Sequence, residues 1–317
     1  MTDLASLLGE PRLKLVAKLE PIAGTRFQPT GFPDLGPATY PSPVDGRRLL
    51  LVESAQSMAN RLESRLWDVT NKEPIDLARG LPYVRVFDNG GEYLTSSRTE
   101  SHRLASAYVK AAAFDGTTGL ELIGERLGLA KQRPIDHARV ARAVFDLDPL
   151  CLLHGVFFAD EKWPGQPKVA RAVTAFVEAA GVQEAYSGGV KFDHVSNKGD
   201  KDVDKRTAKE GFGNVPFART EFVAESIAAS FVIDLSQIRR YALEDREREL
   251  LLALALFEIR SLLHDGLRLR TACDLLVESI ELERPKAFEL PDLGSLEQEI
   301  RERIAEQSPP LDGVYGG

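Results

Sequence analysis

The chain has 317 residues, a formal net charge of −8, 43% hydrophobic residues and 28% charged residues. This composition is typical of a globular protein, either one large domain or a core with sizeable insertions. The negative charge argues against a simple nucleic-acid-binding domain, which is usually basic. The two cysteines, Cys151 and Cys273, lie in apolar runs, which indicates reduced thiols rather than disulfides or a zinc site.

Targeting signals are not evident in the sequence. The N-terminal stretch MTDLASLLGEPRLKL lacks the basic segment and long apolar core of a signal peptide. The longest apolar run, Leu250–Phe257, is too short to span a bilayer. We therefore expect a soluble, cytoplasmic protein without a membrane partner.

The N-terminal part of the chain predicts a strand, a loop and a helix. Arg12–Glu20 alternates apolar and polar residues, which predicts a strand, and a glycine- and proline-containing loop follows Pro21. Residues 31–47 read as irregular. Residues 50–68 predict a helix, because their apolar residues recur at spacings of three and four. These are Leu51, Ala55, Met58, Leu62 and Leu66.

The remaining elements follow from apolar periodicity and from glycine or proline boundaries. We predict strands at 81–88, 150–158, 182–195, 219–235 and 267–276, a turn at 89–91, and helices at 168–181 and 244–266. The Gly-Gly pair within 182–195 indicates either a bulge or a close approach of another backbone. The segment at about 100–146 predicts an inserted helical region with Asp136 as an N-cap, and residues 196–216 predict a flexible or extended loop. The acidic tail predicts a helix near 293–306 and a frayed end.

Common catalytic and metal-binding sequence patterns are missing. The chain has no Walker P-loop, no GxGxxG that opens a helix, no GxSxG and no HExxH. Asp200, Asp202 and Asp204 have the spacing of an EF-hand loop, but Lys205 replaces its glycine and Gly211 replaces its bidentate glutamate. We therefore expect no metal and no cofactor.

The histidines also lack an evident catalytic partner. His154 lies in an apolar stretch and is more typical of a hydrogen-bonded core histidine than of a catalytic one. His194, which lies beside the loop with Lys191 and Lys198, is the one histidine suited by sequence to acid–base chemistry on RNA. The others are His102, His137 and His264.

Donor-rich positions are spread over several predicted elements. Basic, amide and hydroxyl side chains, together with glycine-rich backbone, are the groups that bind phosphate. The polar face of the 50–68 helix is either an ordinary solvated surface or the lining of a binding groove. A linear polyanion held along a groove would draw donors from several such elements.

Several segments together resemble a known family. They are KLEPIAGTRFQPTGFPDLGPATY, LLVESAQSMANRLE, GGVKFDHV, GFGNVPFARTEF, IDLSQIRRYAL and LFEIRSLLHDGLRLRTACDL. In this order they resemble the backbone subunit of the CRISPR type I-U (also called I-G) Cascade interference complex, in the RAMP superfamily. The resemblance covers Arg12 to Leu276 and leaves out the acidic tail.

The resemblance implies an α+β fold with a modified ferredoxin-like (RRM-like) core and inserted finger and thumb elements. It implies a RAMP domain at 1–276, with the helical insertion at about 100–146 and the loop at about 196–216 as a thumb or finger, and a C-terminal extension at 277–317. Such a subunit is non-catalytic. It oligomerises along CRISPR RNA with other Cascade subunits for antiviral defence, and it presents the spacer for pairing with target DNA.

On this reading the RNA-binding residues come from the loop after the first strand, the helix face, the 196–216 loop with its flanks, and the last strand. They are Gly24, Thr25, Arg26, Gln28, Ser54, Ser57, Asn60, Arg61, Lys191, Lys198, Lys201, Lys205, Arg206, Arg219, Arg268 and Arg270.

Three other hypotheses remain open. One is a CRISPR-associated endoribonuclease acting on repeat RNA, with His194 or His154 and a nearby lysine as its chemical groups. Another is a metal-dependent ribonuclease that uses Asp193 or Asp200. The last is a structural protein that self-assembles without RNA.

Overall fold

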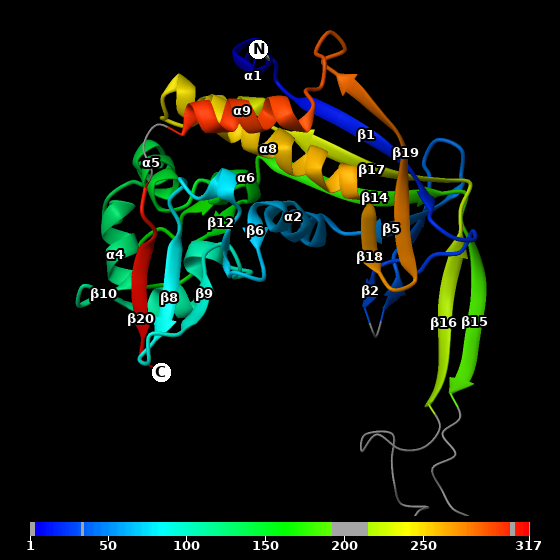
Figure 1. Ribbon diagram of the computed structural model, residues 1–317, viewed down its shortest axis with the longest axis horizontal. Helices are drawn as coiled ribbons and strands as arrows, with labels where there is room; N and C mark the ends of the chain where they lie inside the picture. Colours follow the sequence, from blue (N-terminus) through cyan, green and yellow to red (C-terminus); the bar gives the residue numbers. More distant parts are fainter. Residues whose placement is uncertain (1–3, 33–34, 192–214, 305–307, 317) are drawn as a thin grey trace, which may run out of the picture.

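The fold is built around a seven-stranded sheet in which every neighbouring pair of strands is antiparallel. The computed structural model describes residues 4–32, 35–191, 215–304 and 308–316. The strand order is β18-β19-β1-β17-β14-β5-β4 (Figure 1). In that order the strands span Leu267–Arg270, Cys273–Arg284, Leu13–Pro21, Ser226–Ile233, Val173–Ala180, Arg48–Glu53 and Thr39–Pro41.

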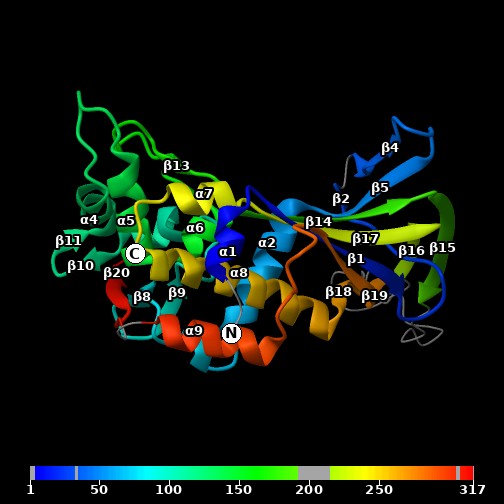
Figure 2. The ribbon, with the colours of Figure 1, turned by 90° about the horizontal axis from the view of Figure 1, so that it is seen from above.

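Long helices cover one face of this sheet. Helix α2 (Ala55–Glu63) packs against β14, and α8 (Asp245–Asp265) packs between α2 and α9 (Leu293–Arg303). Figures 1 and 2 show α2, α8 and α9 on the same side of the sheet. The alternating buried residues of the central strands point into this layer.

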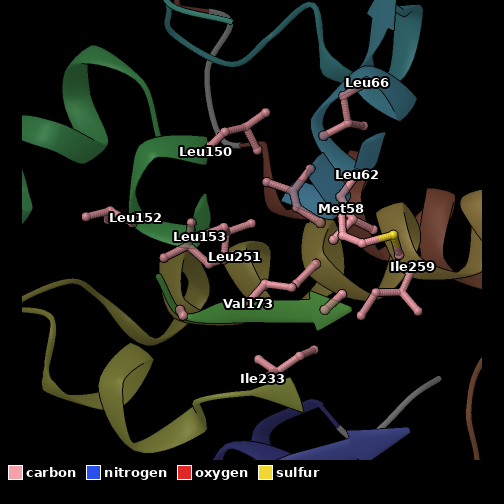
Figure 3. Packing of buried hydrophobic residues seen from close by; sticks show 14 of the residues in the cluster. Met58, Leu62, Leu66, Leu150, Leu152, Leu153, Val173, Ile233, Leu251 and Ile259 are labelled. Atoms are coloured by element: carbon pink, nitrogen blue, oxygen red, sulfur yellow. The ribbon is translucent and has the colours of Figure 1, made fainter. Parts of the chain in front are cut away.

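The core lies between the sheet and this helical layer. In Figure 3, Met58 and Leu62 of α2 lie beside Leu251 and Ile259 of α8, above Val173 of β14. All five side chains are at most 1% exposed. The apolar stripe expected for α2 therefore packs in the core.

A second, five-stranded sheet lies beside the first, in the order β11-β10-β20-β8-β9 (Figure 1). Its C-terminal strand β20 lies in the middle, parallel to β8. The strands span Thr117–Thr118, Ala113–Phe114, Leu311–Tyr315, Val84–Asp88 and Tyr93–Ser96, and the helices of this region are α3 (Ala107–Ala111), α4 (Gly119–Arg126) and α5 (His137–Leu147).

A two-stranded ribbon continues from the middle of the main sheet. It pairs β15 (Gln183–Lys191), which follows β14, with β16 (Val215–Val223), which precedes β17. Figure 1 shows the ribbon projecting away from the body of the protein. The remaining elements are α1 (Leu4–Gly9), β2 (Gly31–Phe32), β3 (Gly36–Pro37), η1 (Ser64–Leu66), β6 (Trp67–Asp68), β7 (Glu73–Pro74), η2 (Asp76–Ala78), η3 (Arg103–Ala105), α6 (Leu150–His154), β12 (Val156–Phe157), β13 (Lys168–Val169) and α7 (Leu235–Arg240).

Many predicted elements are confirmed. The first strand is β1, the 81–88 strand and its turn form the hairpin β8–β9, and the 219–235 segment forms β16 and β17. The 244–266 helix is α8, with Gly266 at its C-terminal end, and the tail helix is α9. The side chain of Asp136 caps α5 as expected. The 31–47 segment, expected to be irregular, contains the short strands β2, β3 and β4.

The helix predicted for 50–68 begins later than expected. Residues Arg48–Glu53 are strand β5, which pairs with β14 and β4. Ser54 has extended backbone angles and caps α2 with its side chain. Strand pairing therefore outweighs the helical spacing of Leu51.

The strand predicted for 150–158 was wrong in its first half. Residues Leu150–His154 form the short helix α6, and only Val156–Phe157 form a strand. All five residues of α6 are buried. Because no exposed face interrupts the apolar run, its sequence cannot distinguish a helix from a strand. The Leu150 N–H donates to Asp148 Oδ1 at 3.1 Å, which starts the helical turn.

The helix predicted for 168–181 was also wrong. Its residues form β13 and β14, and β14 pairs with β17 on one side and β5 on the other. Val173, Ala175, Val177 and Ala179 are buried on one face. Gly181 has φ +65° and follows the last residue of the strand β14, so it does not end a helix.

Two smaller expectations are also corrected. The ribbon keeps one register through Gly188 and Gly189, so the bulge, one of the two interpretations of this pair, is absent. The C-terminal end is not frayed, because Leu311–Tyr315 forms β20. This strand is held by long-range pairing that local composition does not reveal.

Candidate nucleic-acid interface

A hollow of about 260 Å³ lies where the loop after β1 meets the ribbon and the β18–β19 turn. The loop residues Ile22–Arg26 form one wall, Glu221 of β16 forms part of another, and residues 271–274 close it. Gly24 has φ +67° and open space at its Cβ position, which suits a glycine in a tight turn near a ligand. The structure thus brings Gly24, Thr25 and Arg26 to one hollow.

Arg26 is the exposed cation of this hollow. Its side chain is 56% exposed, and Nη1 lies 3.5 Å from Glu221 Oε2. The Glu221 side chain is only 11% exposed, so Arg26 is the solvent-facing partner of a half-buried pair. The exposed guanidinium can therefore bind an external anion while it stays close to Glu221.

The end of the loop is fixed by backbone hydrogen bonds. The N–H of Phe27 donates to the Phe222 carbonyl at 2.9 Å, and the Phe222 N–H donates back at 2.8 Å. The Gln28 N–H donates to the Ala272 carbonyl at 2.7 Å. Because both phenylalanines are 1% exposed, the loop is anchored to the ribbon and to the β18–β19 turn.

Glu53 organises the floor beside this hollow and was not singled out by sequence reasoning. Its carboxylate is buried and accepts from Arg270 Nη2 at 2.7 Å and from Arg61 Nη2 at 3.4 Å. Arg270 Nη1 also donates to the Gln28 carbonyl at 2.8 Å, and Arg61 donates to the carbonyls of Arg268 and Leu269. Both guanidiniums therefore hold β5, α2 and β18 together.

The predicted helix face has mixed roles. Ser54 is the N-cap of α2, and its Oγ accepts from the Ser57 N–H at 3.3 Å. Asn60 is exposed. Since Ser54 uses its oxygen for the cap and Arg61 points to carbonyls, this face is more structural than the sequence suggested.

The other predicted donors are placed unevenly. Arg268 is exposed on the edge strand β18, and Arg219 is exposed on β16 opposite Ser187. Lys191 ends β15 at the far end of the ribbon from Glu221. Four predicted donors lie outside the described residues: Lys198, Lys201, Lys205 and Arg206.

His154 is a core histidine. It is fully buried, and its Nε2 lies 2.8 Å from Glu258 Oε2. Burial favours the neutral ring, but the Glu258 and Glu63 carboxylates and the hydrogen bond to Glu258 outweigh this and raise the pKa of His154. His194, Asp193 and Asp200 lie outside the described residues.

Both thiols are buried and free. Burial raises the pKa of Cys273 to about 11. Within the described ranges, no group of three or more histidine, cysteine, aspartate or glutamate side chains is arranged to hold a metal ion. No helix there is long and apolar enough to cross a membrane.

The chain is similar to known CRISPR-associated proteins. The family model described as "CRISPR-associated protein GSU0053" matches residues 13–184. A chain of a structure titled "CRISPR RNA-guided surveillance complex, pre-nicking" is 14% identical, with a TM-score of 0.40, over 78% of this chain and 69% of that one. Csc2 of Thermofilum pendens is 10% identical, with a TM-score of 0.32, over 95% of this chain and 79% of that one. No curated protein matches the sequence.

Proposed function

Because the chain belongs to the family of CRISPR-associated protein GSU0053, a family of type I-U CRISPR proteins, we propose that it is a Cascade backbone subunit that binds CRISPR RNA. This membership confirms the resemblance found in the sequence. In the proposed role, copies of the chain line up along the guide and present its spacer to target DNA. Other Cascade subunits complete the particle, and the chain itself performs no catalysis.

We propose that the core is a modified ferredoxin-like fold. The order β19-β1-β17-β14 supports this, because the corresponding positions along the chain are fourth, first, third and second. Helix α2 lies between the first and second of these strands in sequence, and α8 lies between the third and fourth. This is the βαββαβ arrangement of the ferredoxin-like fold, here with the strand β5 inserted.

The proposed RNA site is the hollow beside the ribbon, and its exposed Arg26 is the observation that carries it. Phosphate is bound by such guanidinium groups and by glycine-rich backbone. Gly24 supplies such backbone, because it lines the same hollow as Arg26. Guide pairing would supply sequence recognition, while the protein would contact the backbone of the RNA. A net charge of −8 is compatible with this, because only a local basic site is needed on each copy.

We assign the ribbon β15–β16 as the base of the thumb. It leaves the sheet between the second and third core strands and projects from the body (Figure 1). Its root lies directly beside the hollow, because Glu221 belongs to both. An RNA strand in the hollow would therefore also contact the ribbon.

The endoribonuclease alternative is less well supported by the described residues. His154 is fully buried and paired with Glu258, so RNA cannot reach its ring without unfolding of the core. Cleavage of a repeat RNA that is lost on His194→Ala would favour this alternative.

The test is purification of the chain co-expressed with its partner subunits and a CRISPR array. Size-exclusion chromatography with absorbance at 260 and 280 nm should show a large particle that carries RNA of uniform length. Arg26→Ala should reduce the RNA-bearing fraction. Arg79→Ala is the matched control, since Arg79 has a 55% exposed side chain and pairs with Glu73 in the other sheet region.

Each outcome of this test has a clear meaning. A small, RNA-free protein in the presence of its partners and array would contradict the proposed function. A particle of unchanged size after ribonuclease treatment would favour self-assembly without RNA. Equal losses in Arg26→Ala and Arg79→Ala would argue against the hollow as the RNA site.

A further inference from the structure

Tyr186 has a position on the ribbon that packing within the chain does not explain. Its side chain lies on β15 and is 78% exposed. Among the aromatic residues whose exposure is known, it is the most exposed. Leaving an aromatic ring in water forgoes its burial energy, so a contact outside the chain is a natural explanation.

The ring is held in one orientation from the root of the ribbon. Its hydroxyl donates to Glu184 Oε2 at 2.7 Å, and Arg48 Nη2 donates to Glu184 Oε1 at 2.8 Å. Arg48 starts β5 of the main sheet and also lies over the Phe222 ring at 5.9 Å. This chain of contacts fixes the exposed ring relative to the core, which lowers the entropy cost of stacking on it.

The ribbon surface beyond the ring is flat. Alternation along β15 places Gly188 on the same face as Tyr186, one step further from the main sheet. Gly188 pairs with Ala218, so no side chain larger than a methyl group rises from this pair. The Tyr186 hydroxyl points the other way, toward Glu184, and the flat strip beside the ring is left free for a planar group.

One cation lies on the same face of the ribbon as this strip. Arg48 is 45% exposed and donates to Glu184, which stands two residues before Tyr186 and therefore shares its face. Arg219 and Glu221, the partner of Arg26, occupy the alternate positions of β16 and face the other side. An exposed ring, a flat ladder and a guanidinium on one face form a combination that binds single-stranded nucleic acid by stacking and phosphate contacts.

We propose that Tyr186 is a base-stacking residue that receives one nucleobase of the guide RNA on the ribbon, with Glu184 and Arg48 as its positioning residues. The proposal rests on the proposed function and adds to it the residue and the mode of contact. The base lies against the ring and over the Gly188–Ala218 pair, and its phosphate faces Arg48.

The test uses the complex assembled on synthetic CRISPR RNA with 5-iodouridine at single positions. Irradiation couples this base to an aromatic ring stacked on it, and mass spectrometry identifies the linked peptide. We expect linkage to Tyr186 from one or a few guide positions, its loss in Tyr186→Ala, and its retention in Tyr186→Phe. RNA affinity should fall about tenfold in Tyr186→Ala.

Two further variants separate stacking from a structural role. Glu184→Gln weakens the anchor of the hydroxyl and should reduce the linkage yield without abolishing it. Tyr108→Ala is the matched control, because Tyr108 is 43% exposed in the other sheet region, and it should leave both linkage and affinity unchanged. Thermal unfolding of each variant checks that the chain remains folded.

The outcomes distinguish failure of this inference from failure of the proposed function. An RNA-bearing complex without linkage to Tyr186 overturns this inference and leaves the proposed function intact. In a second arm the iodinated base is placed in the target DNA instead, and linkage of Tyr186 to the DNA but not to the guide overturns the inference as well. A complex without RNA overturns the proposed function and the inference together.

Discussion

Glu53 and Arg270 form an ion pair in which Arg270 Nη2 lies 2.7 Å from Glu53 Oε2, and the carboxyl side chain is only 3% exposed. The pair joins β5 to the end of β18, directly before the turn residues 271 and 272 that line the hollow. Arg61 approaches the same oxygen at 3.4 Å, so one buried carboxylate serves two cations. The loop end at Gln28 depends on this arrangement, because Arg270 also donates to its carbonyl.

Replacing Glu53 should therefore be strongly destabilising. Glu53→Ala leaves two partly buried guanidiniums without their carboxylate, and we expect the free energy of unfolding to fall by about 3 kcal/mol. Glu53→Gln keeps the shape and one acceptor and should cost less. Urea unfolding measures both.

A matched control for Glu53 is Glu73→Ala. Glu73 is 38% exposed and pairs with Arg79, so its loss should change stability by about 1 kcal/mol or less. Similar losses in Glu53→Ala and Glu73→Ala would show that the buried pair has no special role.

His154 should make stability depend on pH. Its pKa is higher in the folded chain than the ordinary value, despite burial, because of Glu258 and Glu63. A histidine of this kind stabilises the fold fully below its unfolded pKa of about 6.5, and the contribution is lost as pH rises through the folded pKa.

We therefore expect wild-type protein to lose stability as pH rises from about 6 to 8, and His154→Gln to lose less over the same range. Urea unfolding midpoints at several pH values measure this. His137→Gln is the control, because His137 is exposed at the start of α5. A His154→Gln variant with the wild-type pH slope would contradict the assignment.

Sequence reasoning succeeded where local signals agree with the final packing. The alternation in β1 and the acid-rich start and glycine end of α8 are read directly from the chain. It failed at β14 and α6. There, an alanine-rich run became a central strand through pairing with β17 and β5, and an apolar run was buried on all sides.

The site was predictable to a similar extent. The loop with Gly24 and Arg26 was identified because glycines and donors follow a clear strand. The partner of Arg26 could not be identified, since Glu221 is distant in sequence and reaches the loop only through the ribbon. Glu53 gave no signal either, because a lone acid before a helix is ordinary in sequence.

Gly313 offers a test of the central position of β20. A Cβ at this residue would lie 2.5 Å from the Phe114 ring, so Gly313→Ala must displace a buried aromatic side chain. We expect a loss of about 1–3 kcal/mol. Hydrogen exchange should show reduced protection in β8 and β10 and little change in β1 and β17.

The control for Gly313 is Gly294→Ala in α9. The nearest atom to a Cβ at Gly294 is 3.5 Å away, and alanine favours a helix over glycine by up to about 1 kcal/mol. This variant should be neutral or more stable. Unchanged protection of β8 in Gly313→Ala would contradict the importance of β20 for this sheet.

Arg26 and Glu221 should have opposite effects on RNA affinity. The purified full chain can be titrated with fluorescent single-stranded RNA by anisotropy between 50 and 200 mM salt. If Arg26 contacts one phosphate, Arg26→Ala should weaken binding and reduce the slope of log affinity against log salt by about 0.7.

Glu221→Gln should instead strengthen binding, because it removes both the competing partner at 3.5 Å and a repulsive charge beside the hollow. Arg79→Ala provides the reference for an exposed arginine away from the hollow. If Glu221→Gln weakens binding as much as Arg26→Ala does, the ion pair itself shapes the site, and Arg26 is not exchanged between Glu221 and phosphate.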